Sequence, residues 1–284
     1  MATTSKALRI MAASTAAMVV VLMLVGGLVT TTETGDTIPT WPHWRGQLKG
    51  GMWIEMSHRF LGMIAGVMAI ALAVLARNAS PWLRRLAWIA LAGVVVQGLL
   101  GFLRVRFPHE GPSQAVTAII HAVFAQVVFC AVVAVSVGQS RAWELRGAGD
   151  ARGVGVAATA ACLLQLVAGA VARHTGIGFE VHAIGAVAVL VLASLLASRL
   201  LMTPLRRGAW TLTVLLLSQI ALGVLTWALT RHAGFERGMA APAGTLLLVS
   251  AHVVLGAGLL AACLCLTLLS GPGRKAPRLG AVAA

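Results

Sequence analysis

Long apolar stretches alternate with short polar segments along the whole chain. Eight of these stretches are long enough to cross about 30 Å of hydrocarbon as helices. They occupy residues 10–30, 52–76, 82–103, 114–137, 153–172, 177–200, 208–230 and 244–269. A helix satisfies its own backbone hydrogen bonds, so it is the structure expected for a single apolar segment in lipid. The pattern therefore predicts an all-α integral membrane protein with eight transmembrane helices.

The composition agrees with this interpretation. Hydrophobic residues make up 59% of the chain and charged residues 11%, with a mean hydropathy of +0.90, whereas roughly 25% of a soluble domain is charged. The four cysteines all fall in predicted helices, where we expect small core residues rather than disulfides.

Basic residues are distributed by loop rather than gathered in one patch. The formal net charge is +14, and with the N-terminus inside, 14 Lys and Arg fall on the inner side and eight on the outer side. The positive-inside bias therefore places both termini in the cytoplasm, and the charge does not indicate a nucleic-acid partner. No Arg-rich and Ser-rich transit segment precedes the first helix, so we expect a multi-pass protein of a bacterial plasma membrane.

An internal repeat divides the chain into two halves. It pairs residues 24–29 with 166–171 and residues 97–101 with 219–223. Small residues in these motifs let helices approach closely in lipid. We therefore expect two tandem pseudo-symmetric four-helix bundles, at residues 1–140 and 153–270, joined by an inner loop.

Four histidines lie inside the even-numbered apolar stretches: His58, His121, His182 and His252. Each lies five to eight residues after the start of its stretch. At about 1.5 Å per residue, all four are expected at one depth near the outer face. The repeat matches His58 with His182 and His121 with His252, so each bundle has one pair.

Helix geometry indicates what such a pair can bind. The second and fourth helices of a bundle tend to stand diagonally, roughly 11 to 14 Å apart. This gap suits a porphyrin whose iron takes one imidazole from each side, and it is too wide for a compact zinc site. A lone intramembrane histidine could instead form a hydrogen bond between helices. Two registered pairs favour haem, with all four histidines as ligands of haem iron.

Glu55 lies three residues before His58, on the same helix face and one turn nearer the surface. Its carboxylate could therefore reach the edge of a haem bound by His58. The alternative is an interfacial ion pair with Arg59, in the favourable i, i+4 order. The second half has Phe179 at the equivalent position, and Glu180 points largely away from that face. This asymmetry predicts chemistry on the haem of the first bundle and an electron-transfer or structural haem in the second.

The remaining histidines, and the tryptophans near the first outer loop, are expected in outer loops or at outer helix ends. Ordinary solvated or interfacial roles are the favoured interpretation there. These residues are His43, His109, His174, His232, Trp41, Trp44 and Trp53.

In their order along the chain, these residues resemble the haem A synthase family, membrane enzymes that convert haem O to haem A. The resemblance covers essentially the whole chain. It rests on residues 26–30 followed by 34–35 and 41–42, on Glu55-Met56-Ser57-His58-Arg59, on Gln97 with Gly101, and on His121, His182 and His252. The chain departs from many members in having Thr40 before the Trp-Pro of the first outer loop, and from some in lacking a cysteine pair there.

The resemblance implies an oxidoreductase that oxidises a methyl group of haem O to a formyl group by successive hydroxylations, to give haem A for terminal oxidase biogenesis. The implied residues are Glu55 as the catalytic carboxylate, His58 and His121 facing the substrate haem, and His182 and His252 on a haem b cofactor. Arg59 could pair with a haem propionate. The expected partners are the lipid bilayer and an electron-transfer protein, with a haem O synthase and a second copy of the chain as open alternatives.

Two other functions share parts of this pattern. A di-haem b-type membrane cytochrome, which transfers electrons without chemistry on its haem, would need the same four histidines but not Glu55. A transporter built from two repeats would need broken helices or charges at the midplane. The inner halves of the predicted helices carry no such charge.

A reporter fusion tests the predicted orientation. A reporter that is active only in the periplasm is expected to be silent after Ala284 and active when inserted between Arg231 and Met239, because the inner loops carry more Lys and Arg. A fluorescent protein that folds only in the cytoplasm is the control and should give the opposite pattern. Periplasmic activity after Ala284 would contradict the orientation.

Overall fold

The computed structural model describes residues 6–32, 34–35, 38, 50–106, 112–147, 149–232 and 243–271. The α-helices are α1 (Lys6–Thr31), α2 (Met52–Ala76), α3 (Pro81–Arg106), α4 (Pro112–Gly138), α5 (Arg152–Thr175), α6 (Phe179–Leu200), α7 (Arg206–His232) and α8 (Ala243–Leu269). A short 3-10 helix, η1 (Arg141–Leu145), joins α4 to α5, and the described part contains no strand. All eight α-helices are long and apolar enough to span a membrane, which confirms the predicted fold class.

Most helices are longer than the apolar stretches that predict them. The first helix begins at Lys6 and the seventh at Arg206, because a long basic side chain can lie along the helix while its charge reaches water. The sixth helix is shorter and begins at Phe179. Before it, Gly176 and Gly178 have φ angles of 73° and 84°, a left-handed conformation that ends α5 and redirects the chain.

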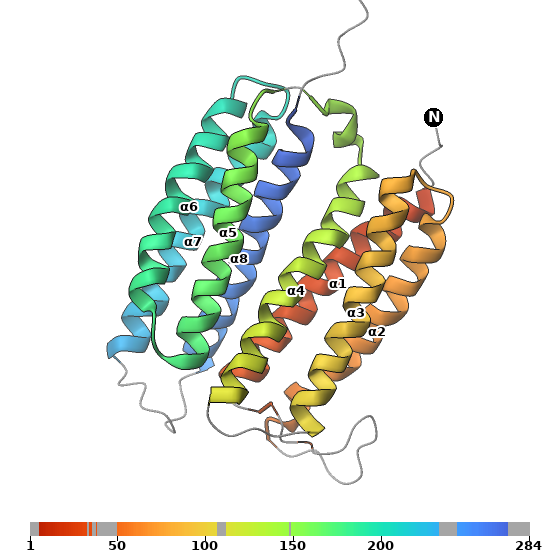
Figure 1. Cartoon of the computed structure of the whole chain (residues 1–284). Coiled ribbons are helices and arrows are strands. Elements are labelled where there is room, and N and C mark those ends of the chain that lie inside the picture. Colours follow the sequence, from red (N-terminus) through yellow and green to blue (C-terminus); the bar gives the residue numbers. More distant parts are fainter. Residues whose placement is uncertain are drawn as a thin grey trace, which may run out of the picture.

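Each half of the chain forms a ring of four helices. In the first half α1 packs on α2, α2 on α3, α3 on α4 and α4 on α1, and α5 to α8 repeat this order. The second and fourth helices of each half therefore stand diagonally, as predicted, and so do the first and third. Figure 1 shows the two bundles side by side. The tandem arrangement is thus confirmed, while the limits 1–140 and 153–270 stay a prediction.

The two bundles meet along α1 and α4 of the first and α5 and α8 of the second. A buried apolar cluster fills this interface, formed by Val19, Phe129, Val133 and Ala257. The linker contacts both bundles: Trp143 of η1 stacks on Trp82 of α3, with ring centres 5.0 Å apart, and the Gly147 N–H donates to the Leu269 carbonyl of α8 over 2.7 Å. The linker thus ties the bundles together at one end, which we call the η1 end.

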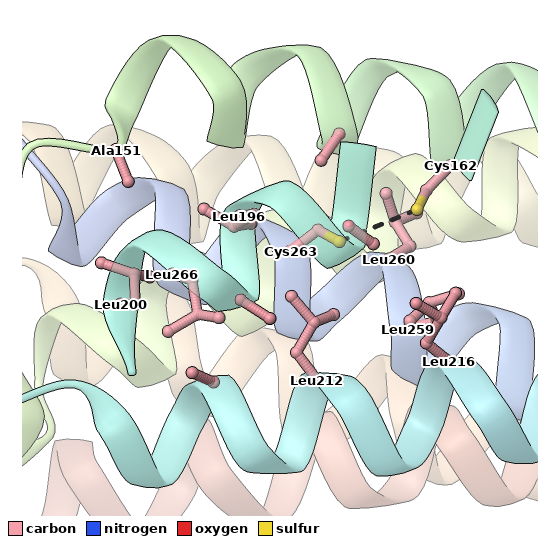
Figure 2. Close-up of a cluster of buried hydrophobic side chains, with 14 of the residues drawn as sticks. Ala151, Cys162, Leu196, Leu200, Leu212, Leu216, Leu259, Leu260, Cys263 and Leu266 are labelled. Carbon is pink, nitrogen blue, oxygen red and sulfur yellow. Dashed lines mark hydrogen bonds between the residues drawn. The ribbon is translucent and has the colours of Figure 1, made fainter. Parts of the chain in front are cut away.

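The main apolar core of each bundle lies toward the η1 end. In the second bundle this core includes the fully buried Leu196, Leu200, Leu212 and Leu260, with the free thiols Cys162 and Cys263 beside them, Sγ atoms 3.8 Å apart (Figure 2). In the first bundle it includes Leu8, Leu72, Leu83, Val132 and Val135. Neither of these clusters, as the described residues form them, extends to the other end of its bundle, where the four histidines lie and which we call the histidine end.

Close helix approach in the second bundle depends on Gly155 of α5. A Cβ at this position would lie 2.5 Å from Thr267 Oγ1 and 3.1 Å from Thr267 Cα on α8, whereas a Cβ at Gly153 would meet nothing within 4 Å. Gly155→Leu is expected to lower the melting temperature of the detergent-solubilised protein by roughly 2 to 8 °C, because overpacking costs about 1 to 3 kcal/mol. Gly153→Leu is the matched control and should change it little. Equal melting temperatures would contradict the packing described here.

Candidate functional site

Each intramembrane histidine packs against a glycine of the preceding helix, a contact that we call the glycine seat. The pairs, with the distance from an ideal glycine Cβ position to the histidine Cε1 atom, are Gly26–His58 (2.8 Å), Gly101–His121 (3.7 Å), Gly169–His182 (2.8 Å) and Gly223–His252 (2.9 Å). A glycine in a helix interior lowers the stability of the helix by about 1 kcal/mol relative to alanine. At the three tight seats no other residue leaves room for the imidazole.

A glutamine one turn before the glycine contacts the histidine in three of the four hairpins. The contacts are Gln97 Nε2 to the His121 carbonyl (3.0 Å), Gln165 Nε2 to the His182 carbonyl (2.7 Å) and Gln219 Nε2 to His252 Nε2 (3.4 Å). Leu22 occupies this position in the first hairpin. The four hairpins are therefore variants of one template, and the first hairpin is the one without the amide.

The His182 ring is oriented by the backbone of the same glutamine. Its Nδ1 lies 3.2 Å from the Gln165 carbonyl oxygen, which leaves Nε2 as the nitrogen available to a ligand. The Nδ1 atoms of His58, His121 and His252 are buried and have no hydrogen-bond partner in the described part of the chain. The backbone of Leu22 lies beside His58 without reaching hydrogen-bond geometry.

The second histidine pair has a separation that fits two ligands of one iron. The ring centres of His182 and His252 are 6.3 Å apart, and the ring planes are inclined by 78°. An imidazole nitrogen lies about 2 Å from a first-row metal and roughly 1 Å from its ring centre, so two imidazoles on one iron have centres about 6 Å apart. His252 Nε2 would have to exchange its long contact with Gln219 for such a bond.

The donor set also fits haem better than a bare metal ion. Among the described residues, no three His, Cys, Asp or Glu side chains come together as a metal site. Two imidazoles would leave a bare ion short of protein ligands, whereas a porphyrin supplies the other four ligands of its iron. The residues present at the second pair therefore fit a haem.

The predicted range of five to eight residues between the start of each stretch and its histidine is narrower than the range seen in the helices. His58, His121, His182 and His252 lie six, nine, three and nine residues after the first residue of their helices. His182 and His252 are nevertheless neighbours. Helices that project to different heights can still bring their histidines together, because the glycine seat rather than the helix start sets the position of each ring.

Glu55 and Arg59 form the ion pair that the sequence left as an alternative, but the pair is buried. Glu55 is 4% exposed. Its Oε1 accepts a hydrogen bond from Arg59 Nη2, and its Oε2 accepts one from the Ile38 N–H over 3.2 Å. Arg59 Nη2 also donates to the Ile38 carbonyl over 2.8 Å. The carboxylate is thus fixed one turn from His58 and binds the backbone of Ile38.

The equivalent region of the second bundle is apolar. Phe179, three residues before His182, stacks on Trp227 of α7 with ring centres 6.1 Å apart. Ala183 takes the position of Arg59, and Glu180 is exposed. The predicted asymmetry between the halves therefore involves more than one carboxylate. A buried ion pair lies beside the histidine in one bundle, and an aromatic pair lies beside it in the other.

Arg173 connects the second site to the first bundle. Its Nη2 donates to the Gly27 carbonyl of α1 over 2.9 Å. Gly27 also packs on Ser250, two residues before His252, and Thr31 Oγ1 lies 3.2 Å from Ser250 Oγ. Gly26, the seat of His58, is the preceding residue of α1. Helix α1 thus contacts both histidine sites.

Only some of the other predicted outer residues lie in the part of the chain that the structure describes. His43, His109, Trp41 and Trp44 lie outside the described residues, as does the side chain of His232. Trp53 is 60% exposed, as expected of an interfacial residue. His174 is half-buried in the last turn of α5, next to Arg173.

Sequence reasoning noted Gln97 with Gly101 and the matching residues 219–223, but it missed the contacts of these glycines and glutamines with the histidines, and it missed Arg104 and Arg173. The spacing Gln-x-x-x-Gly occurs once in each of α3, α5 and α7. Read together with the histidine on the next helix, this spacing could have revealed the template. The arginines lie near helix ends, where hydropathy treats them as ordinary interfacial residues.

A family model described as COX15-CtaA, cytochrome oxidase assembly protein, matches residues 47–182 of the chain. The matched segment contains Glu55, His58, His121 and His182, and it ends before His252. No curated protein matches the chain. The family agrees with the resemblance drawn from the ordered motifs. Residues 47–182 are thus similar to the COX15-CtaA family of cytochrome oxidase assembly proteins.

Proposed function

We propose that this protein is a haem A synthase, with haem O as the substrate of the first bundle and haem b as the cofactor of the second. The proposal rests on the asymmetry between two otherwise equivalent histidine sites, since a buried carboxylate accompanies His58 and an aromatic pair accompanies His182. A role in cytochrome oxidase assembly, which the family has, agrees with the production of haem A.

The proposed reaction converts one methyl group of haem O to a formyl group. Two successive hydroxylations give a geminal diol, which loses water to form the aldehyde. Each hydroxylation oxidises this carbon by two electrons, and the haem irons, when bound, would exchange electrons with the external electron-transfer partner to balance the reaction. The residues of the chain would place the substrate between His58 and His121, exclude lipid and water from it, and handle protons at the reacting carbon.

Glu55 is the residue best placed for the proton or charge role. Arg59 and the Ile38 N–H hold both of its oxygens in fixed directions. A carboxylate fixed in this way can stabilise positive charge that develops at the reacting carbon, or accept a proton from an attacking water. Arg59 is already engaged by Glu55 and the Ile38 carbonyl, so its contact with a propionate stays a prediction.

The second site has the features expected of an electron-transferring cofactor site. His182 is held by two contacts with Gln165, and the Phe179–Trp227 stack offers an apolar cover with no reactive group. Ligands held in a fixed orientation keep the structural change small when the charge on an iron changes. An electron-transfer protein, and a haem O synthase or a second copy of this chain, are proposed partners, with both termini cytoplasmic and the sites near the outer face.

Analysis of the haems extracted from the purified protein tests the proposal. Reversed-phase chromatography is expected to recover haem b together with haem O or haem A from cells that make haem O. Haem b alone, at two per chain, would favour the di-haem electron-transfer cytochrome instead. A colourless protein would exclude both functions.

The seat of His182 gives a separate test of the second site. Gly169→Ala places a Cβ 2.8 Å from His182 Cε1, so the imidazole must move and haem b affinity is expected to fall roughly ten- to hundred-fold. Gly153→Ala, on the same helix and in open space, is the matched control and should retain haem b. The measurement is the absorbance of bound haem per chain. Full haem b content in Gly169→Ala would contradict the assignment.

Glu55→Gln tests the catalytic carboxylate. This change keeps the shape of the side chain and removes its charge, so haem A formation is expected to fall at least about hundred-fold while haem b stays bound. Haem O, or singly hydroxylated haem O, should accumulate. Glu180→Gln, at an exposed acid near the second site, is the control and should leave conversion unchanged.

The buried ion pair makes a stability measurement necessary beside this assay. If Glu55 only anchors the segment after α1, Glu55→Gln should lower the melting temperature and the content of both haems together, because breaking a buried pair is costly. Haem A yield that falls only in proportion to folded protein would remove Glu55 from the catalytic role.

A further inference from the structure

Arg104 is a charged side chain at the first histidine site that the proposed mechanism does not use. It lies on α3 three residues after Gly101, the seat of His121. Residues three apart share a helix face, so Arg104 projects from the face that meets His121, one turn nearer the histidine end. Its backbone position therefore directs it into the bundle.

The guanidinium of Arg104 extends across the bundle. Its Nη2 lies 3.9 Å from the position that a Cβ would take at Gly35. Gly35 follows α1, which stands diagonally opposite α3 in the ring. The charge thus lies at the histidine end, within electrostatic range of both His58 and His121.

Arg104 has no counter-ion among the described residues. Its Nε is buried without a hydrogen-bond partner, and no hydrogen bond or ion pair of this side chain occurs in the described part of the chain. The buried carboxylate of the same bundle, Glu55, is bound by Arg59. An arginine in a membrane helix is costly unless its charge is paired, and its planar fork of N–H donors matches a carboxylate.

We propose that Arg104 binds a propionate carboxylate of the porphyrin held between His58 and His121, and so positions this substrate. The proposal rests on the proposed function only for the identity of the porphyrin as haem O. It differs from the sequence interpretation, which assigned a propionate to Arg59. The second bundle has Thr226 at the position equivalent to Arg104, so this contact belongs to the first site alone.

The orientation of the substrate follows from such a contact. Haem O has both propionates on one edge, so a carboxylate held at Arg104 fixes which edge faces the histidine end of the bundle. The methyl group that reacts is then presented to one side of the site in every turnover. Arg104 is on this account a positioning residue, and its loss would affect binding before it affects chemistry.

The test compares a porphyrin that has carboxylates with one that lacks them. The full chain in phosphatidylcholine nanodiscs is titrated with haem and with haem dimethyl ester, and binding to the first site is the part of the absorbance change that disappears in His58→Ala. Arg104→Gln is expected to weaken this part roughly ten- to hundred-fold for haem and to leave the ester unchanged. Arg104→Lys should restore part of the difference, because it keeps the charge without the fork.

Arg85→Gln is the matched control, since Arg85 is an exposed arginine at the opposite end of the same helix. It should bind both porphyrins as the unmodified chain does. Equal weakening of haem and ester by Arg104→Gln would mean a structural role and overturn the proposal, as would unchanged haem affinity. A difference that depends on replacing phosphatidylcholine with phosphatidylglycerol rather than on esterification would assign Arg104 to a lipid headgroup and overturn it too.

The outcome separates this proposal from the proposed function. If extracted protein never contains haem O or haem A but Arg104→Gln selectively weakens haem, the synthase function fails and the carboxylate site stands. If haem A is made and Arg104→Gln has no selective effect, only the Arg104 proposal fails. If the unmodified chain shows no His58-dependent porphyrin binding, both are overturned.

Discussion

The contact between a helical glycine and a histidine ring, made across each of the four hairpins, is the constraint on which the site depends. Hydrophobic burial does little to bring helices together in lipid, so close approach requires small residues and polar contacts. At three of the seats a single methyl group would collide with the imidazole. The same glycine therefore sets both the distance between two helices and the position of a histidine ring.

This arrangement separates packing from chemistry along the membrane normal. The main leucine- and alanine-rich cores of the bundles occupy the η1 end, where the linker and the stacked Trp82 and Trp143 also join the halves. The histidine end is held instead by polar contacts of glutamine, threonine and serine with neighbouring helices. Apolar packing therefore predominates at one end of each bundle and polar contacts at the other.

Two copies of one structural template, with different side chains around the histidines, give two different sites. Both bundles have histidines packed on glycine seats, and the side chains around these histidines differ between the bundles. The first site has charged side chains: the buried pair of Glu55 and Arg59, and Arg104, which has no counter-ion among the described residues. At the position equivalent to Glu55, the second site has Phe179, which stacks on Trp227. Helix α1 contacts both sites through Gly26 and Gly27, so the two sites share one structural element.

The sequence by itself determined the eight helices, the repeat and the histidines, because apolar length and residue spacing are local properties that lipid makes decisive. It could not decide the surroundings of those residues. Whether Glu55 and Arg59 form an exposed pair or a buried one depended on Ile38, which comes from the segment before α2. The level of each histidine depended on a glycine from another helix, and the direction of Arg104 depended on the ring order of the bundle. These are contacts between residues distant in sequence, which hydropathy and periodicity do not record and only the tertiary structure decided.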